Sequence, residues 1–303
     1  MNYLYFTVGL PGSGKSTWIE NHMEDAVVHS SDAIREEFGD INDQSRNERV
    51  FKTLNNRVKS DLAAGKDVIV DQTGLVRKRR IAFLENIKAF PCRKICILFA
   101  TPYEVCVEND FKRDRNVTRS VIDRMIKSFS VPCKQEGWDE IQIVWWDYKK
   151  GGIEFNYLTD LEKWRMISHD NPHHSLSIGD HMIEASKFVT KKEGDYRLLA
   201  AVLMHDCGKP FTKGFVDSKG NPSDVAHFYG HDNVSSYFSL FYLKEICLSK
   251  EDILYISLLI GLHMKPFLAW SQSERAKIKD SVLYGSYIIR QVEILHECDL
   301  AAH

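Results

Sequence analysis

The sequence predicts two domains of different classes, an α/β domain over residues 1–150 and an all-α domain over residues 151–303. A length of 303 residues favours two domains over one, because a domain typically holds about 100 to 200 residues. Short β-branched or aromatic runs alternate with amphipathic segments before residue 147, whereas only helical patterns follow it. Ten of the twelve histidines lie after residue 151, so the two halves also differ in chemistry.

The first half alternates predicted strands with predicted helices. The strands are expected over residues 3–8, 26–29, 68–71, 94–99 and 141–146. The helices between them are expected over residues 46–64, 77–89 and 103–113. This alternation is typical of βαβ units, in which the strands form a parallel sheet and helices flank it.

The second half reads as helices only. A charged, glycine-containing stretch, residues 149–152, predicts a linker, so we expect the domain boundary within about ten residues of Gly151. Apolar residues three or four apart predict helices over residues 161–167, 178–190, 196–205, 233–247, 251–263 and 274–301. Residues 214–230 are predicted to form a loop long enough to be functional.

The composition is that of a globular chain. With 44% hydrophobic and 27% charged residues, it argues against a disordered, collagen-like or coiled-coil protein. A formal net charge of −2 excludes a polycationic protein that coats DNA in bulk, but leaves room for a local basic patch. The seven cysteines form no CxxC pair, which predicts reduced, mostly buried thiols. With neither a membrane-length apolar run nor a signal-peptide pattern, we expect a cytoplasmic protein without a membrane partner.

A glycine-rich loop follows the first predicted strand and opens a helix. Its sequence, Gly-Leu-Pro-Gly-Ser-Gly-Lys-Ser-Thr, matches the phosphate-binding loop pattern in the context that the pattern requires, which argues against a turn without a ligand. Glycines let backbone N–H groups converge on phosphate, Lys15 reaches the β and γ phosphates, and Ser16 coordinates Mg²⁺. The expected cofactor is ATP or another NTP with Mg²⁺, and the residues expected to bind it are Gly9, Gly12, Ser13, Gly14, Lys15, Ser16 and Thr17.

Asp32 and Arg35 are the candidate acceptor-side residues. Asp32 follows the second predicted strand, at the edge where the carboxyl ends of parallel strands meet, so it can accept a proton from an attacking hydroxyl. Arg35, one turn later, can hold an anionic acceptor. The alternative is that Asp32 only caps a helix. Asp71 and Thr73 end the next strand at the same edge.

Two clusters of basic residues could contribute cations to this site. Residues 77–80 are either a solvated helix face or part of the site. The later cluster, Lys112-Arg113-Asp114-Arg115, is the better candidate for a lid that brings cations onto the transferring phosphoryl group.

The order and spacing of these motifs resemble the 5′-hydroxyl polynucleotide kinases of RNA repair over roughly residues 1–147. The resemblance implies a P-loop kinase domain in which Lys15 and Ser16 bind NTP and metal. It further implies that Asp32 is the general base on the 5′-OH of RNA or DNA, that Arg35 contacts the acceptor phosphate, and that Lys112 or Arg113 takes the lid role. Glu108 and Gly74 stand where the family usually has an arginine and an asparagine.

The dipeptide His205-Asp206 closes an apolar helix and precedes a turn, which places two ligands at a rigid, partly desolvated helix end. Imidazole suits Mn²⁺, Fe²⁺, Co²⁺, Ni²⁺ or Zn²⁺, and a carboxylate can bridge two ions. His181 and Asp299 are polar residues within other apolar helices. Alone, each is more often a hydrogen-bonded core residue than a ligand.

Together these residues give the ordered pattern H…HD…D, which resembles the HD phosphohydrolases, above all the HD modules of bacterial tRNA nucleotidyltransferases, over about residues 165–303. The resemblance implies an all-α HD domain. It implies a first metal set of His181, His205, Asp206 and Asp299, and a second ion at His231 and His263. Asp206 would bridge the ions or orient water, and Lys209 would contact the scissile phosphate. His169 is assigned to a loop.

The two halves together suggest a bifunctional end-healing enzyme for RNA, a 5′-OH kinase with a metal-dependent 2′,3′-cyclic phosphodiesterase and phosphatase. Its expected substrates are 5′-OH ends of RNA or DNA and 2′,3′-phosphate ends of RNA, and a separate RNA ligase is a candidate partner. Two alternatives stay open. One is a small-molecule or nucleoside kinase fused to an HD nucleotidase, and the other is an NTP-gated regulatory protein that senses a nucleotide.

Overall fold

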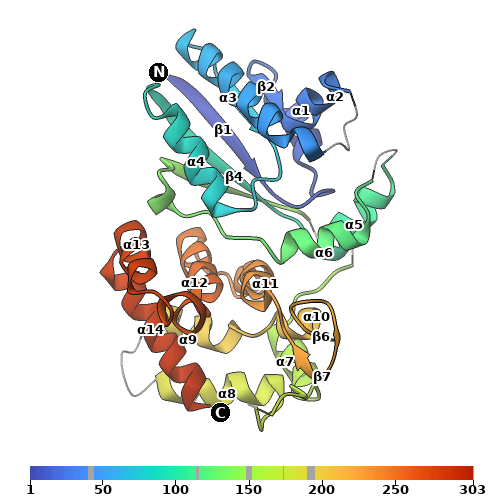
Figure 1. The fold of residues 1–303 in the computed structure, drawn as a ribbon, viewed down its shortest axis with the longest axis vertical. Helices are drawn as coiled ribbons and strands as arrows, with labels where there is room; N and C mark the ends of the chain where they lie inside the picture. Colours follow the sequence, from blue (N-terminus) through green and yellow to red (C-terminus); the bar gives the residue numbers. More distant parts are fainter. Residues whose placement is uncertain (40–43, 114–115, 148–151, 173, 190–194, 303) are drawn as a thin grey trace. The chain divides into compact units, whose positions relative to one another are not determined.

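The computed structural model describes residues 1–39, 44–113, 116–147, 152–172, 174–189 and 195–302 (Figure 1). The chain divides into two units. The first unit comprises Met1–Met125 and Pro132–Gly151, and the second comprises Ile126–Val131 and Gly152–His303. The expected boundary residue Gly151, with Lys149 and Lys150, lies outside the described residues. The short segment Ile126–Val131 of the first half of the sequence groups with the second unit.

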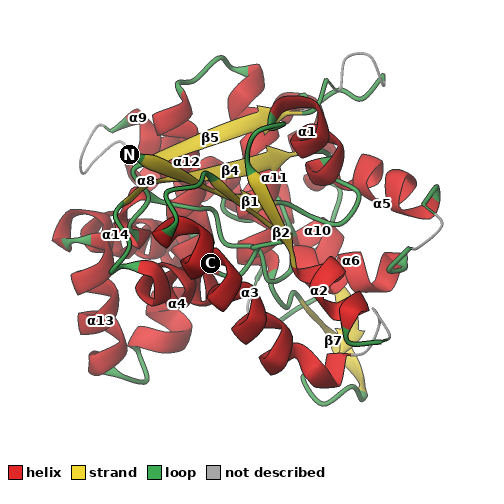
Figure 2. Ribbon diagram, turned by 90° about the horizontal axis from the view of Figure 1, so that it is seen from above, coloured by secondary structure: helices red, strands yellow, loops and turns green. Residues whose placement is uncertain are grey.

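The first unit is built on a five-stranded parallel sheet with the strand order β2-β3-β1-β4-β5. The strands are β1 (Asn2–Val8), β2 (Val27–Ser30), β3 (Val68–Asp71), β4 (Cys92–Ala100) and β5 (Glu140–Trp145) (Figure 2). Most residues of the central strands β3, β1 and β4 are buried, and all of these except Thr7 are apolar, as in strands covered on both faces. The predicted parallel sheet flanked by helices is confirmed.

Helices connect these strands. They are α1 (Lys15–His22), α2 (Ser31–Glu37), α3 (Asn47–Ala63), α4 (Arg77–Ile87), α5 (Tyr103–Phe111) and α6 (Arg119–Ile126), with short 3-10 turns at Gln44–Arg46 and Lys134–Glu136. In α3, Val50, Leu54, Val58 and Leu62 recur every fourth residue and are buried, which is the apolar stripe that a covering helix needs. The loops at the carboxyl ends of β1, β2 and β3 carry the predicted nucleotide site.

The basic cluster at residues 77–80 contains a buried structural arginine. Arg80 is fully buried, and its guanidinium donates to both carboxylate oxygens of Glu136 at 2.7 and 2.6 Å. It also donates to the carbonyls of Gly74 and Leu75 at 2.8 and 3.0 Å. The cluster is therefore not only a solvated face, because Arg80 ties α4 to the turn after Cys133.

Breaking this ion pair is expected to destabilise the first unit. Arg80→Met leaves the Glu136 carboxylate buried without its cation, so we expect the free energy of unfolding to fall by about 3 to 5 kcal/mol in urea denaturation. The matched control is Arg79→Met, since Arg79 is exposed on the same helix. A change for Arg80→Met within about 0.5 kcal/mol, the range of surface substitutions, would contradict this assignment.

The second unit is mostly helical. Its helices are α7 (Tyr157–Trp164), α8 (Ile178–Val189), α9 (Tyr196–Met204), α10 (Lys209–Thr212), α11 (His231–Glu245), α12 (Lys250–Leu262), η3 (Pro266–Trp270), α13 (Glu274–Tyr284) and α14 (Ser286–Ala301). The single helix expected over residues 274–301 is wrong. Gly285, at φ 85° and ψ 155°, breaks it into α13 and α14.

The expectation of an all-α second half also needs a correction. The segment 214–230, expected as a loop, holds an antiparallel hairpin of β6 (Gly214–Val216) and β7 (Pro222–His227). Asp217 Oδ1 accepts the backbone N–H groups of Lys219 and Asn221, both at 2.8 Å, and Gly220 has φ 89°. These local hydrogen bonds close the turn, and both strands are short.

All seven cysteines are free, and six of them are buried, with Cys247 exposed. The expectation of reduced, mostly buried thiols is confirmed. One helical stretch, Lys250–Trp270, is apolar and long enough by composition and length to cross a membrane. Half of its most apolar window is buried inside the fold. Ile256, Leu259 and Ile260 of α12 lie in the core of the second unit.

Candidate functional site

The glycine-rich loop connects β1 to α1. Gly12 and Gly14 have φ 73° and 85°, the left-handed region that favours glycine. A Cβ at Gly12 would lie 2.2 Å from the carbonyl oxygen of Cys106, so only glycine fits against α5. Gly14 is the N-cap of α1, which leaves the first N–H groups of the helix at the loop. An anion-binding loop needs this geometry.

Lys15 points back into this loop. Its ammonium donates to the carbonyls of Leu10 and Gly9 at 2.7 and 3.2 Å and to the Ser13 hydroxyl at 3.2 Å. Burial lowers the pKa of Lys15, although the charge of Asp71 opposes the shift. Since a phosphate would replace weak carbonyl partners with anionic oxygens, binding one stabilises the charged form of Lys15.

Ser16 and Asp71 form an oxygen-donor pair beside the loop. The Ser16 hydroxyl donates to Asp71 Oδ2 at 3.1 Å. Asp71 ends β3, which pairs directly with β1, so the two oxygens meet at the carboxyl edge of the sheet. A hydroxyl and a carboxylate suit Mg²⁺, which prefers hard oxygen ligands. Thr17, also expected to bind the nucleotide, is exposed on α1.

Asp32 and Arg35 lie together at the start of α2. Arg35 Nη1 donates to Asp32 Oδ1 at 2.8 Å, and Nη2 donates to the Asn47 side chain at 2.9 Å. The N-cap of α2 is Ser30, whose hydroxyl accepts the N–H groups of Asp32 and Ala33. Asp32 is therefore not the capping residue, and its carboxylate, 54% exposed, lies at the surface beside Arg35. A proton acceptor and a cation thus stand side by side.

The lid candidates Lys112 and Arg113 follow the last turn of α5. Lys112 pairs with Glu108 at 2.6 Å, and Arg113 lies 3.8 Å from Asp110. Two contacts fix α5 and its strand to the glycine-rich loop: Asn109 donates to the Gly12 carbonyl at 3.0 Å, and the Thr101 hydroxyl donates to the Ser13 carbonyl at 3.0 Å. Asp114 and Arg115 of the predicted cluster lie outside the described residues.

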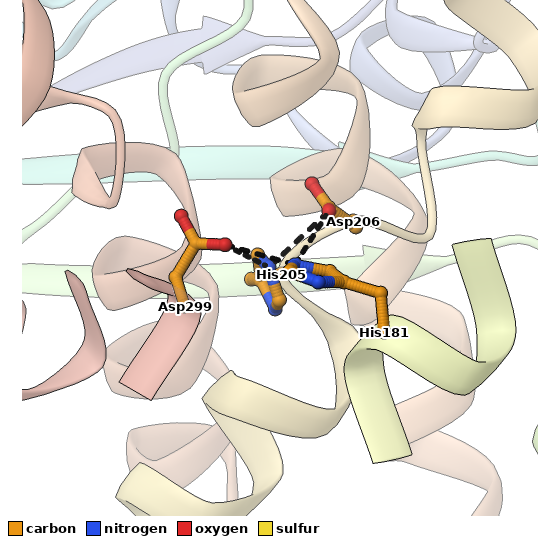
Figure 3. A group of neighbouring side chains, drawn as sticks. All are labelled: His181, His205, Asp206 and Asp299. Atoms are coloured by element: carbon orange, nitrogen blue, oxygen red, sulfur yellow. Dashed lines mark hydrogen bonds and ion pairs between the residues drawn. The ribbon is translucent and has the colours of Figure 1, made fainter. Parts of the chain in front are cut away.

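In the second unit, four side chains from three helices meet at one point (Figure 3). His181 of α8, His205 and Asp206 at the end of α9, and Asp299 of α14 each offer a ligand atom within 4.8 Å of the others. Asp299 Oδ1 lies 2.8 Å from His181 Nε2 and 3.5 Å from His205 Nε2. Two imidazole nitrogens and two carboxylates suit a divalent transition metal.

Asp206 also faces a second cluster. Its Oδ2 lies 3.2 and 3.6 Å from the Nε2 atoms of His205 and His181, whereas its Oδ1 lies 3.3 and 3.9 Å from those of His231 and His263. The two Nε2 atoms of His231 and His263 are 3.1 Å apart. A carboxylate with one oxygen toward each cluster is placed to bridge two ions.

Backbone carbonyls orient three of the imidazoles. The Nδ1 atoms of His205, His231 and His263 lie 2.7 to 2.8 Å from the carbonyl oxygens of Val202, Phe228 and Ile260, three residues earlier in each case. A carbonyl can only accept, so each Nδ1 carries the proton and each Nε2 is directed toward the clusters. Such outer contacts hold metal-ligating histidines in the correct tautomer.

The charges within the clusters shift several pKa values. Burial opposes the ionised carboxylate, but His205 and Lys209 hold the pKa of Asp206 well below its usual range. Burial likewise opposes a charged imidazole, but Asp206 and Asp299 outweigh it and raise the pKa of His205 to about 10. Burial and the neighbouring His231 and His205 lower the pKa of His263 to about 3.

Metal binding is expected to release a proton from His205. Because its pKa is raised to about 10, this imidazole is protonated at pH 8 in the metal-free protein, and a metal needs its lone pair. We expect calorimetric titration with Mn²⁺ at pH 8, in buffers of different ionisation enthalpy, to show about one proton released for each ion at the first cluster. Affinity should rise with pH up to about 10. A histidine with the usual pKa of about 6.5 would release almost no proton at pH 8. That result would contradict the raised pKa of His205.

Lys209 reaches the same carboxylate. Its ammonium lies 2.7 Å from Asp206 Oδ2 and 3.1 Å from His169 Nε2. His169 is in a loop, as expected, but its side chain is completely buried beside Lys209. Burial and the charge of Lys209 lower the pKa of His169 to about 4, so this histidine is neutral. The sequence pattern gave His169 no role.

A family model described as an AAA domain matches residues 4–132. The first unit contains a P-loop kinase-like domain. The matched residues include Lys15, Asp32, Arg35, Asp71 and Lys112 of the kinase-like domain, and they end before His181, the first residue of the two candidate ligand clusters. No curated protein matches the chain significantly.

Among the solved structures that resemble the chain in part are three with identities of 18 to 24%. One from the Pnkp1/Rnl/Hen1 RNA repair complex is 19% identical, with a TM-score of 0.39, over 51% of this chain and 47% of that one. Another from the Pnkp1/Rnl/Hen1 complex is 24% identical, with a TM-score of 0.33, over 39% and 42%. A candidate kinase from Chloroflexus aurantiacus is 18% identical, with a TM-score of 0.41, over 55% and 96%. The chain thus spans less than half of the two chains from Pnkp1/Rnl/Hen1 complexes.

The sequence pattern predicts Asp71 at the carboxyl edge of the sheet but gives it no role. The structure pairs it with Ser16, the expected Mg²⁺ ligand. A signal was available, because an aspartate that ends a buried strand beside the phosphate loop commonly helps to hold Mg²⁺ in P-loop enzymes.

Proposed function

We propose that this chain is a bifunctional RNA end-healing enzyme, an NTP-dependent 5′-hydroxyl polynucleotide kinase with a metal-dependent 2′,3′-cyclic phosphodiesterase and phosphatase. The observation that supports it most is the presence of two complete residue sets in one chain. A proton acceptor and a cation, Asp32 and Arg35, stand at the sheet edge that bears the phosphate loop, and Asp206 faces two histidine clusters. One set suits adding phosphate to a hydroxyl, and the other suits hydrolysing phosphate esters.

In the kinase reaction, the loop N–H groups and Lys15 hold the β and γ phosphates, and Ser16 with Asp71 would hold Mg²⁺. When bound, that ion neutralises charge on the phosphates. The 5′ oxygen attacks the γ phosphorus while the bond from this phosphorus to the bridging oxygen of the diphosphate breaks. The hydroxyl proton passes to Asp32, and Arg35 holds the phosphate that follows the 5′ nucleoside. Lys112 or Arg113 balances the charge on the transferred group.

In the hydrolytic reaction, His181, His205, Asp206 and Asp299 would hold one divalent ion, and His231 and His263 a second with Asp206. When bound, such ions supply an activated water and neutralise phosphate charge. Asp206 positions the attacking water, whose oxygen bonds to phosphorus as the bond to the 2′ or 3′ oxygen breaks. The proton lost by the water ends on that departing oxygen, which leaves as a hydroxyl. Lys209 contacts a phosphate oxygen. These roles follow the HD phosphohydrolase pattern that the sequence resembles.

The decisive experiment uses RNA with a 5′-OH and a 2′,3′-cyclic phosphate, incubated with ATP and Mg²⁺ or Mn²⁺. Both termini are then read by mass spectrometry. We expect a 5′-phosphate and an opened or removed 2′,3′-phosphate in the same molecule. Preference for nucleosides over 5′-OH oligonucleotides would favour the fused small-molecule kinase and nucleotidase instead. No hydrolysis with any of several divalent metals would favour a nucleotide-sensing regulatory protein.

The RNA ends that the two proposed reactions produce indicate a partner protein. The products, a 5′-phosphate and a 3′-hydroxyl, are the ends that a separate RNA ligase joins, so such a ligase is the proposed partner. We further propose a cytoplasmic location. RNA is preferred to DNA in this proposal because only RNA can carry a 2′,3′-cyclic phosphate.

A further inference from the structure

His169 occupies an unusual place for a loop histidine. It belongs to the loop between Ser168 and Ser177, which form an isolated antiparallel bridge, and its ring is completely buried. The His174 ring stacks on it at 4.0 Å between centroids, and the Phe228 ring meets its edge at 5.8 Å. Aromatic contacts therefore fix the plane of this imidazole from two sides.

Its hydrogen bonds fix the tautomer. His169 Nδ1 lies 2.9 Å from the Leu176 carbonyl oxygen, which can only accept, so Nδ1 carries the proton. The lone pair is then on Nε2, which lies 3.1 Å from the Lys209 ammonium. His169 Nε2 thus accepts a hydrogen bond from Lys209. The Leu176 carbonyl and the stacked His174 ring hold the His169 ring in the orientation that this bond needs.

Lys209 is held by two acceptors of different kinds. One is Asp206 Oδ2, 2.7 Å away, an oxygen that also faces the first ligand cluster. The other is His169 Nε2, a neutral atom outside both ligand clusters. Without His169, the lysine would have Asp206 alone, and its ammonium would compete with a cation for that oxygen. With His169, one N–H is directed away from Asp206 and the ammonium stays at the edge of the cluster.

We propose that His169 is a positioning residue for hydrolysis, which holds Lys209 where its ammonium can contact the substrate phosphate. This inference rests on the proposed hydrolytic function. The His169 ring packs edge-on against the His181 ring, 5.6 Å between centroids, but among the described residues its only hydrogen bond toward the clusters is the one with Lys209, so we infer that it acts through Lys209. The competing interpretation is a core histidine whose hydrogen bonds serve only the fold.

Three variants separate these interpretations. His169→Asn keeps an amide near Nδ1 but removes the acceptor at Nε2, and we expect kcat for 2′,3′-cyclic phosphate opening to fall about tenfold to a hundredfold. His169→Gln places an amide oxygen near the position of Nε2 and is expected to recover most of that loss. In a Lys209→Ala background, His169→Asn should have no further effect, because its partner is already gone. His227→Asn, a histidine of the same unit outside both clusters, is the control.

A second readout needs neither metal nor turnover. In metal-free protein, ¹⁵N NMR of the imidazoles should show His169 protonated at Nδ1, and Lys209→Ala should shift the Nε2 resonance of His169 more than that of His227. If the parent hydrolyses no phosphate ester, the proposed function fails while this measurement still tests the contact. Losses from His169→Asn and Lys209→Ala that multiply in the double variant, or no rescue by glutamine, would overturn the positioning role.

Discussion

Asp206→Asn is expected to lower the turnover of phosphate ester hydrolysis by at least about a hundredfold, because even outer contacts of metal ligands are worth tenfold to a hundredfold. Among the residues that the structure describes, Asp206 alone has one oxygen toward each cluster: Oδ2 lies 3.2 Å from His205 Nε2, and Oδ1 lies 3.3 Å from His231 Nε2. An amide presents only one oxygen and no charge. The variant should therefore bind fewer divalent ions than the parent in equilibrium dialysis, and it should keep 5′-OH kinase activity.

The control for this experiment is Asp232→Asn. Asp232 also follows a histidine in sequence, but it lies outside both ligand clusters, so hydrolysis should stay at the parent level. Loss of the charge at Asp206 also leaves Lys209 without its closest acceptor, so a thermal melt must show that the variant is folded. Parent-like hydrolysis by folded Asp206→Asn would remove the bridging role and with it the proposed metal chemistry.

The sheet could be predicted because most residues of its central strands are buried and apolar. The segment 68–71 is a continuous apolar run ending in a polar residue, and the structure has a strand at Val68–Asp71. Sequence could not show the hairpin β6 and β7 as clearly, because short exposed strands lack an apolar face. It also missed the break at Gly285, since apolar spacing continues through residues on both sides of it.

Some residues of the candidate sites could be predicted from the sequence, and others could not. The residues of motifs that are contiguous in sequence, such as Lys15 and Ser16, could be named from spacing alone. The contacts that complete the sites join residues far apart in the chain: Asp71 to Ser16, and His169 to Lys209. Arg80 shows the converse, because a charge run suggests solvent, whereas its partner Glu136 makes it a core residue. No local pattern carries such information, which depends on the fold.

Asp32→Asn is expected to lower kcat for transfer to a 5′-OH oligonucleotide by about 10² to 10⁴, the usual contribution of a general base. Asparagine can still accept the hydrogen bond from Arg35 Nη1, and Arg35 keeps its bond to Asn47, so the acceptor's cation stays in place. The substitution therefore removes proton acceptance and the charge of the carboxylate, but keeps a hydrogen-bond acceptor for Arg35. KM for ATP should not change, because in the proposed site the phosphates are held by the glycine-rich loop and Lys15.

Glu36→Gln on the same helix is the matched control, since Glu36 is exposed and the substitution removes an equal charge from α2. A loss confined to Asp32→Asn separates proton acceptance from a general effect of charge on the acceptor. Hydrolysis of a 2′,3′-cyclic phosphate, measured in the same samples, should be unaffected by either variant. If Asp32→Asn transfers phosphate at the parent rate, the proton must pass to another group, and the polynucleotide kinase assignment loses the residue on which its acceptor chemistry depends.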